Sequence, residues 1–590
     1  KISNIETFTL KSLGDYSLDL SNVSDLQYIL SEGSLGKVTV NGLQNASTIF
    51  GFSGSGANNI ILTGNDLGGS TDVLELKLIG AENVSFQAPI GYERLDIELQ
   101  GPSSISSILA SGISTTEVIG QGDLTIGSSV NDLSSFSSKN LDGKISGASL
   151  DYDGFSKSGV IGSILGTEVE LGDASDNFYF VDKADANALN TVHLGPGDDK
   201  ITYVISTHSQ NSINGDQGDD QFKIIGEKLA LNDIFLGGDG LDTVIIEQDQ
   251  DNLINLSGIE KVVLKNIAAG QNTLVTSGSA LSVIMEAGER GIMSNFSISG
   301  LPSDSDISIE NSLGQTVGLG TFFANYETLE ATDEITVDTV KNSGDFFTEN
   351  IENLEINFLE TVQMSASDFK FDHASNIIID TKKDFVSRNF IGDDSTSVDR
   401  LETLSITGDK SVSIGNTVNT SQLSTINIDA FNDLIAGSLG SGSLSSIFLT
   451  SVQGKISASH IDVSNSGENS SISLVAKDEI NADSGSAMVV SSSSGSIDAN
   501  VSAGYNDSDS SSILLDLTIT SPQEGIVNLT STSTGGIRST ITNAGTQLSG
   551  EKSEIVLGNT FDTKENNITV GGVVNAVQIA GGTGIDLINF

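Results

Sequence analysis

Apolar residues in this chain recur in a six-residue pattern whose first, fourth and sixth positions are apolar. The clearest copies begin at Leu401, Leu423 and Leu444, which lie 22 and 21 residues apart. Further copies are Ile5-Phe8-Leu10, Ala81-Val84-Phe86, Tyr92-Leu95-Ile97, Ile259-Val262-Leu264, Tyr326-Leu329-Ala331 and Ile351-Leu354-Ile356. A glutamate often follows the first apolar residue, at Glu6, Glu82, Glu93, Glu260, Glu327, Glu352 and Glu402. Alternating apolar residues are typical of a strand, and a strand that returns at this interval indicates a solenoid coil.

Glycine and aspartate recur with the same period in a second pattern. Four segments, which begin at Leu171, Leu194, Gly215 and Gly237, have an aspartate in the sixth position and an apolar residue in the eighth. The sixth-position residues are Asp176, Asp199, Asp220 and Asp242, which are separated by 23, 21 and 22 residues. The eighth-position residues Phe178, Ile201, Phe222 and Val244 are expected to enter a strand and to point into the coil. This arrangement is that of the nonapeptide that binds Ca²⁺ in parallel β-rolls.

The residue types in these turns suit calcium. Ca²⁺ takes about six to eight oxygen ligands from carboxylates and backbone carbonyls, and glycine lets the backbone turn its carbonyls inward. One turn supplies only half of such a cage, so two stacked coils must share each ion, and we predict multiple Ca²⁺ ions. An ordinary glycine-rich turn is the alternative for any single copy, but four copies in register favour the metal site. The candidate metal-site residues are Asp173, Asp176, Gly195, Gly197, Asp198, Asp199, Gly215, Asp216, Gly218, Asp219, Asp220, Gly238, Asp239, Gly240, Asp242, Gly582, Gly584 and Asp586.

Together the two patterns predict an all-β chain. We expect a right-handed parallel β-solenoid, a β-helix or β-roll, with about 22 residues per coil and calcium-binding Gly/Asp turns on one edge. The expected segments are a first solenoid segment over 1–130, a linker or excursion over 131–164, a calcium-binding β-roll over 165–270, an irregular β segment with insertions over 271–398, and a C-terminal solenoid over 399–590 that ends in another nonapeptide.

The charge and the cysteine content of the chain limit its possible partners and the groups that could cross-brace its fold. The chain has 590 residues, 78 acidic against 27 basic ones, a net charge of −51 and no cysteine. Such a charge excludes nucleic acid and anionic membrane as electrostatic partners, whereas divalent cations would relieve it. Without cysteine there is no disulfide framework and no zinc–thiolate site, so cross-bracing would fall to metal ions.

Neither a transmembrane helix nor an N-terminal signal segment is expected from the sequence. No apolar run approaches the roughly 18 residues of a transmembrane helix, and Lys1 leads into a polar stretch with no signal-peptide pattern. The nonapeptide at Asp586 lies four residues before the end, which is typical of truncation at a repeat edge.

A strand segment with a glycine, an apolar residue and a glutamate at its start follows the sparse nonapeptides. Gly237 to Val244 is followed by Ser257-Gly-Ile-Glu260-Lys-Val-Val-Leu264, and this arrangement resembles the RTX-type surface-layer (S-layer) proteins of Gram-negative bacteria. The resemblance implies type I secretion, folding triggered by extracellular Ca²⁺, and assembly of a homo-oligomeric lattice on the cell surface. It also implies anchoring to lipopolysaccharide or another cell-surface glycan. The nonapeptides of RTX toxins and proteases are tandem, whereas here they recur once per coil, which disfavours a toxin.

Catalysis has little support in the sequence, and we expect no enzyme. The four histidines, His193, His208, His373 and His460, lie far apart, and neither His-Glu-x-x-His nor Gly-x-Ser-x-Gly occurs. Two alternatives to the S-layer stay open. One is a calcium-stiffened RTX adhesin or extracellular matrix filament. The other, less favoured, is a β-helix polysaccharide-degrading enzyme, which the scarcity of Lys and Arg disfavours for an acidic polymer.

Overall fold

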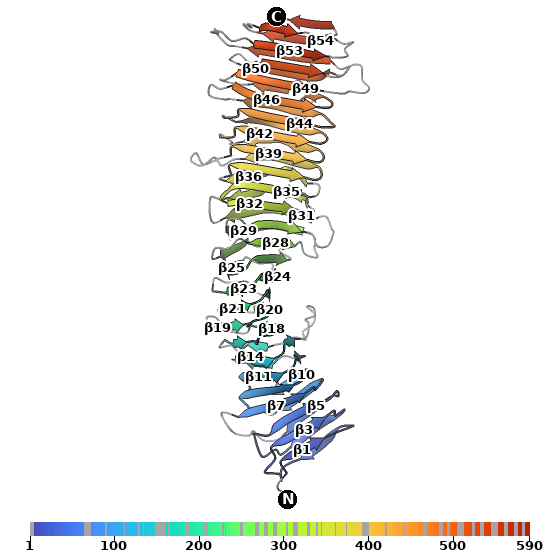
Figure 1. The fold of residues 1–590 in the computed structure, drawn as a ribbon, viewed down its shortest axis with the longest axis vertical. Coiled ribbons are helices and arrows are strands. Elements are labelled where there is room, and N and C mark those ends of the chain that lie inside the picture. Colours follow the sequence, from blue (N-terminus) through green and yellow to red (C-terminus); the bar gives the residue numbers. More distant parts are fainter. Residues whose placement is uncertain are drawn as a thin grey trace. The chain divides into compact units, whose positions relative to one another are not determined.

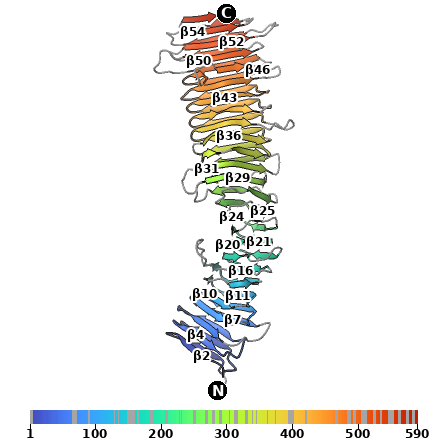
Figure 2. The same cartoon turned by 180° about the vertical axis from the view of Figure 1, so that it is seen from behind.

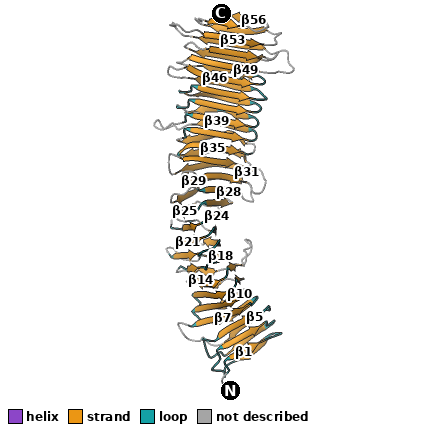
Figure 3. Cartoon of the chain, in the orientation of Figure 1, coloured by secondary structure: helices purple, strands orange, loops and turns teal. Residues whose placement is uncertain are grey.

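The chain is a parallel β-solenoid with about 22 residues per turn, as shown by a computed structural model (Figure 1). The described residues contain strands and loops and no helix (Figure 3), so the predicted all-β solenoid and its period are confirmed. The structure describes residues 5–589 except 64–71, 89–90, 111, 128–129, 134, 148–159, 163–165, 183–187, 206–209, 227–228, 230–231, 248–251, 266–270, 277–280, 287–291, 303–304, 311–316, 327–330, 338–339, 344, 360–361, 373, 392–400, 419–421, 442, 464–468, 483–487, 492–495, 504–512, 522–525, 532–535, 544–552, 560–564, 572–575 and 581–584.

Each coil contributes strands to two parallel sheets, which we call sheet A and sheet B. The strands fall into two compact units, unit 1 over residues 1–265 and 272–281, and unit 2 over residues 266–271 and 282–590. Within each unit, strands of one sheet pair with the equivalent strands of the next coil, as the two opposite views show (Figures 1 and 2). This pairing satisfies the backbone hydrogen bonds between coils, so an equivalent position in every coil falls in one column.

The Gly/Asp turns lie in unit 1. The strands of sheet A around them are β17 (Glu168–Glu170), β19 (Leu189–His193), β21 (Gln210–Gln217), β23 (Ile234–Asp239) and β25 (Asn252–Ser257). The strands of sheet B are β18 (Asn177–Val181), β20 (Lys200–Ile205), β22 (Gln221–Gly226), β24 (Thr243–Glu247) and β26 (Lys261–Lys265). In the preceding residues, β14 (Ser135–Asp142) and β15 (Ile145–Gly147) pair with β17 and β18.

Unit 2 is built in the same way. Its sheet A includes β31 (Val317–Tyr326), β34 (Phe346–Glu349), β36 (Val362–Asp372), β38 (Phe385–Ile391), β43 (Leu434–Ser441), β45 (Ile456–Val463) and β48 (Met488–Ser491). Its sheet B includes β37 (Asn376–Thr381), β39 (Thr403–Gly408), β42 (Thr425–Ala430), β44 (Ser446–Ser451), β46 (Asn469–Ala476) and β49 (Ser496–Ala503). Buried phenylalanines stack inside this unit, with ring centroids 4.4 Å apart for Phe322 and Phe346, 5.3 Å for Phe346 and Phe369, and 5.1 Å for Phe369 and Phe390.

The six-residue apolar pattern marks the start of strands in both sheets. Leu401 lies in the turn before β39, and Leu404 and Ile406 point inward from that strand, all three at most 2% exposed. Tyr92 stands in the same relation to β9 (Arg94–Gln100), which belongs to sheet A. The apolar residues of these two copies therefore lie in the core, as the pattern predicts.

Candidate metal centre

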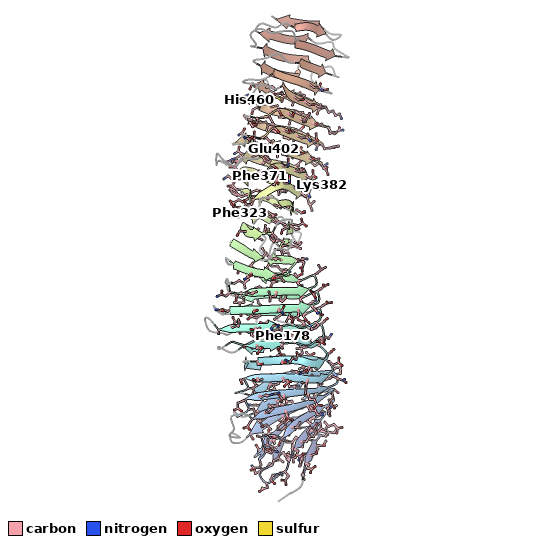
Figure 4. The ribbon with its side chains drawn as sticks, turned by 60° about the vertical axis from the view of Figure 1, so that its left-hand side comes forward. Phe178, Phe323, Phe371, Lys382, Glu402 and His460 are labelled. Atoms are coloured by element: carbon pink, nitrogen blue, oxygen red, sulfur yellow. The ribbon has the colours of Figure 1, made fainter. Side chains whose placement is uncertain are left out.

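The four key aspartates stack in a single column at one edge of unit 1. Each lies in the turn from sheet A to sheet B, directly before β18, β20, β22 or β24, and strand pairing aligns the residues that follow them. The exposed fractions of Asp176, Asp199, Asp220 and Asp242 are 3%, 1%, 1% and 0%. We call these four residues the aspartate column. Phe178, labelled in Figure 4, lies two residues after Asp176 and is buried in the core.

Backbone hydrogen bonds use one oxygen of each carboxylate. The N–H of Asp176 donates to Oδ1 of Asp199 at 2.6 Å, and the N–H of Asp199 donates to Oδ1 of Asp220 at 2.8 Å. The N–H of Asp220 likewise donates to Oδ1 of Asp242 at 2.8 Å. Each aspartate is thus fixed by the backbone of the preceding coil.

A glutamate closes the column. The N–H of Asp242 donates to Oε2 of Glu260 at 2.8 Å, so Glu260 takes the place that an aspartate has in the other coils. Glu260 was not among the predicted metal-site residues, although it belongs to the series of glutamates that follow the first apolar residue of the strand pattern. Its position 18 residues after Asp242, instead of about 22, hides the equivalence.

The second oxygen of each column carboxylate has no partner. Oδ2 of Asp176, Asp199, Asp220 and Asp242 is buried and makes no hydrogen bond. Burial is the main cause that raises the pKa of Asp176 to about 7, of Asp199 to about 8, of Asp220 to about 7 and of Asp242 to about 6. Nearby carboxylates, most of them in the turns of neighbouring coils, also raise the pKa of Asp199, Asp220 and Asp242. A buried carboxylate without a counter-charge is costly, so the column is chemically incomplete without a cation or protons.

Two glycines show where these oxygens point. A Cβ on Gly215 would lie 2.2 Å from Oδ2 of Asp220 and 2.4 Å from the carbonyl oxygen of Gly237 in the next coil. A Cβ on Gly237 would lie 2.4 Å from Oδ2 of Asp242 and 1.8 Å from the carbonyl oxygen of Gly258. A carboxylate oxygen of one coil and a carbonyl oxygen of the next thus converge beside each glycine. Two acceptors that face one another with no hydrogen between them suit a hard cation such as Ca²⁺.

The fifth-position residues of the turns form a separate ladder on the outside. Oδ1 of Asp198 accepts the N–H of Asp219 at 3.0 Å, and Oδ1 of Asp219 accepts the N–H of Leu241 at 2.8 Å. Both aspartates are exposed, as are Asp173 and Asp239. Their carboxylates therefore face solvent, and they do not join the aspartate column.

The remaining predicted residues shape the turns or lie elsewhere. Gly195, Gly197, Gly218, Gly238 and Gly240 have φ values of 86°, 147°, 127°, 112° and 147°, a region that favours glycine. Asp216 adopts φ 72° in the same role, and its carboxylate accepts a hydrogen bond from Asn214 and lies 3.8 Å from Nδ1 of His193. Gly582 and Gly584 lie outside the described residues, as does the side chain of Asp586.

A second buried polar ladder, which the sequence analysis missed, braces the opposite edge of the same coils. Nδ2 of Asn190 donates to Oδ1 of Asn211 at 2.8 Å, and Nδ2 of Asn211 donates to Oδ1 of Asp233 at 2.6 Å. All three side chains are at most 2% exposed. Amide donors meet acceptors here, whereas acceptors meet acceptors in the aspartate column.

In unit 2 the turn from sheet A to sheet B carries a buried leucine two residues before the strand, where it is described between residues 401 and 446. Leu401, Leu423 and Leu444 precede β39, β42 and β44 and are at most 2% exposed. Glu402, labelled in Figure 4, follows Leu401, and its carbonyl oxygen accepts the N–H groups of Ser424 and Thr425. The residues directly before these strands, the position that the aspartate column has in unit 1, are Glu402, Ser424 and Ser445, and none of them is buried.

No three His, Asp or Glu side chains gather into a metal-binding cluster in the described part of the chain. A cation in the aspartate column would therefore need backbone carbonyls to complete its coordination. Gly237 and Gly258 supply such carbonyls. The absence of a side-chain cluster is compatible with calcium, which accepts carbonyl ligands readily.

Two of the four histidines, His193 and His460, have described side chains, and both lie beside polar residues. His193 lies beside Asp216, and Nε2 of His460 lies 2.7 Å from Oγ of Ser491 on the outer face of sheet A. The hydroxyl of Ser491 also lies 3.4 Å from Oδ1 of Asp462. His208 and His373 lie outside the described residues.

A search for membrane-spanning helices among the described residues found none. Comparison with protein-family models, curated proteins and solved structures gave no match to this chain. The site must therefore be interpreted from its own chemistry.

Proposed function

We propose that this protein is an extracellular structural protein whose solenoid is completed by Ca²⁺, and that it assembles into a two-dimensional S-layer on the cell surface. The aspartate column carries this proposal. Four buried carboxylate oxygens lack partners, and at Asp220 and Asp242 each converges with a carbonyl oxygen of the next coil.

The residues of the column would bind Ca²⁺ as follows. Oδ2 of Asp220 and the carbonyl of Gly237 would form one pair of ligands, and Oδ2 of Asp242 and the carbonyl of Gly258 the next. The bound cation supplies positive charge to oxygens that are removed from water. Oδ1 of each aspartate stays on the N–H of the neighbouring coil and holds the carboxylate in place.

Such a column would couple folding to calcium. Ordering each residue costs about 1–2 kcal/mol of backbone entropy, and stacked buried carboxylates add to that cost. An ion that binds only the folded state shifts the equilibrium by mass action. The coils that hold the column would then be much less stable at low calcium than where calcium is abundant, which suits a protein that completes its folding after export.

Two further features favour a structural role over catalysis. The chain repeats one coil geometry over most of its length, and a repeated coil offers the same lateral surface many times. Its net charge of −51 would oppose association unless cations or neutral surfaces mediate it. The resemblance to RTX-type S-layer proteins adds the lattice, type I secretion and a glycan anchor to the proposal.

The test combines circular dichroism with negative-stain imaging during a CaCl₂ titration and after chelation. Ordered sheets that appear together with β signal are the expected result. A β signal with isolated particles would favour the adhesin or matrix filament, and an unchanged spectrum would refute calcium-dependent folding.

A matched pair of double variants assigns the response to the column. Asp199→Asn with Asp220→Asn changes two buried column residues, whereas Asp198→Asn with Asp219→Asn changes their exposed neighbours by the same charge. Only the first pair should weaken the calcium response. Equal effects would show that bulk charge, and not the column, is responsible.

A further inference from the structure

The outer face of sheet B in unit 2 is a regular array of small hydroxyl and amide side chains. Strand pairing aligns the outward residues of β39, β42, β44 and β46 in three columns. We call this array the hydroxyl face. Its columns are Thr403, Thr425, Ser446 and Ser471; Ser405, Asn427, Phe448 and Ser473; and Thr407, Asp429, Thr450 and Val475.

This face is almost free of charge. Asp429 is the single ionisable residue among its twelve members, in a chain with a net charge of −51. The outer face of sheet A in the same unit differs, because it carries Lys370, Arg388 and Asp462. The hydroxyl face is therefore a place where another acidic surface can approach without strong repulsion.

Exposed apolar side chains gather on and beside the same face. Phe448 and Val475 are 40% and 38% exposed on the face itself. Phe431 and Val452, 45% and 49% exposed, lie at its edge in the turns after β42 and β44. These four surround Thr450, and they are four of the six exposed large apolar residues found in the described part of unit 2. Burial of such residues would favour association.

We propose that the hydroxyl face is the surface on which a second copy of this chain docks during assembly. The proposal rests on the S-layer function proposed above and names one of its contact surfaces. A second copy fits the charge pattern, because a self-associating acidic protein needs a contact without like charges on both sides. Threonine and serine are short, so they lose little side-chain entropy when they become buried.

The size of the face suits a lattice contact better than an isolated dimer. Strands about 4.8 Å apart and outward residues about 6.7 Å apart give a patch of roughly 400 Å² per copy. A stable pair usually buries about 800 Å² on each partner. One such contact alone would be weak, so its effect should appear in the assembled layer, where each copy makes several contacts.

Charge insertion tests the face directly. Thr450→Asp places a carboxylate at its centre, and Ser438→Asp places one on the exposed outer side of β43 in sheet A. We expect Thr450→Asp to raise the protein concentration needed for assembly at fixed calcium by about tenfold or more, with the calcium-dependent β signal unchanged. Ser438→Asp should assemble as the parent does.

The absence of cysteine allows a second test that does not depend on a disruptive change. Ser473→Cys introduces a single thiol on the hydroxyl face, and Ser438→Cys introduces one on sheet A. In purified protein a bulky maleimide should label both variants before calcium is added. After assembly, the thiol at position 473 should be protected and the thiol at position 438 should still react.

The outcomes separate this inference from the proposed function. A parent protein that fails to assemble with calcium refutes the S-layer function. Normal assembly of Thr450→Asp, or a reactive thiol at position 473 within assembled sheets, overturns the docking surface alone. If Thr450→Asp assembles normally but no longer binds a neutral polysaccharide that the parent binds, the face serves a glycan and the proposal is wrong.

Discussion

The substitution Asp220→Asn should change stability in opposite directions with and without calcium. Oδ1 of Asp220 accepts the N–H of Asp199 at 2.8 Å, and an asparagine oxygen can accept the same bond. Oδ2 is buried without a partner and converges with the carbonyl oxygen of Gly237. An amide nitrogen at that place can donate to this carbonyl, so asparagine removes a buried charge and adds a donor.

The magnitude follows from the pKa. Burial raises the pKa of Asp220 to about 7 from an ordinary value of 3.8, and one pKa unit corresponds to about 1.36 kcal/mol. The cost of the ionised carboxylate at about pH 8 is therefore at most about 4 kcal/mol. In chelator, Asp220→Asn should raise the free energy of unfolding by about 1–4 kcal/mol. In excess calcium it should lower that free energy, because a charged ligand is lost.

Hydrogen exchange of peptides within residues 194–226 reports on these coils, and urea unfolding followed by circular dichroism reports on the whole chain. Asp219→Asn is the control, since it removes the same charge from the exposed neighbour. If Asp220→Asn lowered the free energy of unfolding in chelator, the argument that the buried carboxylate destabilises the calcium-free protein would be refuted. An unchanged calcium midpoint would show that Asp220 is not a ligand.

Three further predictions concern glycine, pH and the core. Gly237→Ala should abolish the calcium response of the 194–247 coils in hydrogen-exchange experiments, because its Cβ would lie 1.8 Å from the Gly258 carbonyl oxygen. Gly14→Ala is the control and should be neutral, since its Cβ would meet nothing within 4 Å. An intact calcium response in Gly237→Ala would contradict the proposal that the oxygens beside Gly237 bind the ion. Without calcium the four aspartates of the folded column bind more protons than they do in the unfolded chain, because their pKa values are raised. The free energy of unfolding in chelator should therefore be greatest near pH 4 and fall as the pH rises to about 8. Asp220→Asn should make this pH dependence smaller. Phe369→Ala should destabilise unit 2 by about 3–5 kcal/mol equally with and without calcium, and a calcium-dependent loss would contradict a purely apolar core there.

The spacing of apolar residues determined the architecture because a solenoid repeats one local rule. Leu401, Leu423 and Leu444 recur once per coil and are buried where the period predicts. The Gly/Asp spacing likewise predicts that Asp176, Asp199, Asp220 and Asp242 recur once per coil, and they form one column. Strand pairing between neighbouring coils converts equal sequence spacing into spatial alignment, so the sequence alone carries this information.

Only the tertiary structure decided which oxygens of the turns meet. Asp219 and Asp220 are adjacent and chemically identical in sequence, yet one carboxylate faces solvent and the other is 1% exposed. The spacing marks Asp220 as the sixth-position residue, but it does not predict that the carboxylate of Asp219 faces solvent, which follows from the alternation of side chains at the strand entry. Glu260 closes the column through a shorter coil, and its role depends on a contact with the backbone of Asp242.

The buried ladder on the opposite edge and the neutral character of the hydroxyl face also depend on the folded structure. Asn190, Asn211 and Asp233 are ordinary polar residues in sequence, and they become a buried ladder because three successive coils bring them within hydrogen-bonding distance. The neutral character of the hydroxyl face emerges only when strand register aligns residues that lie about 22 positions apart. A periodic sequence determines that coils stack, whereas side-chain burial and partners depend on distances between coils that only the folded chain defines.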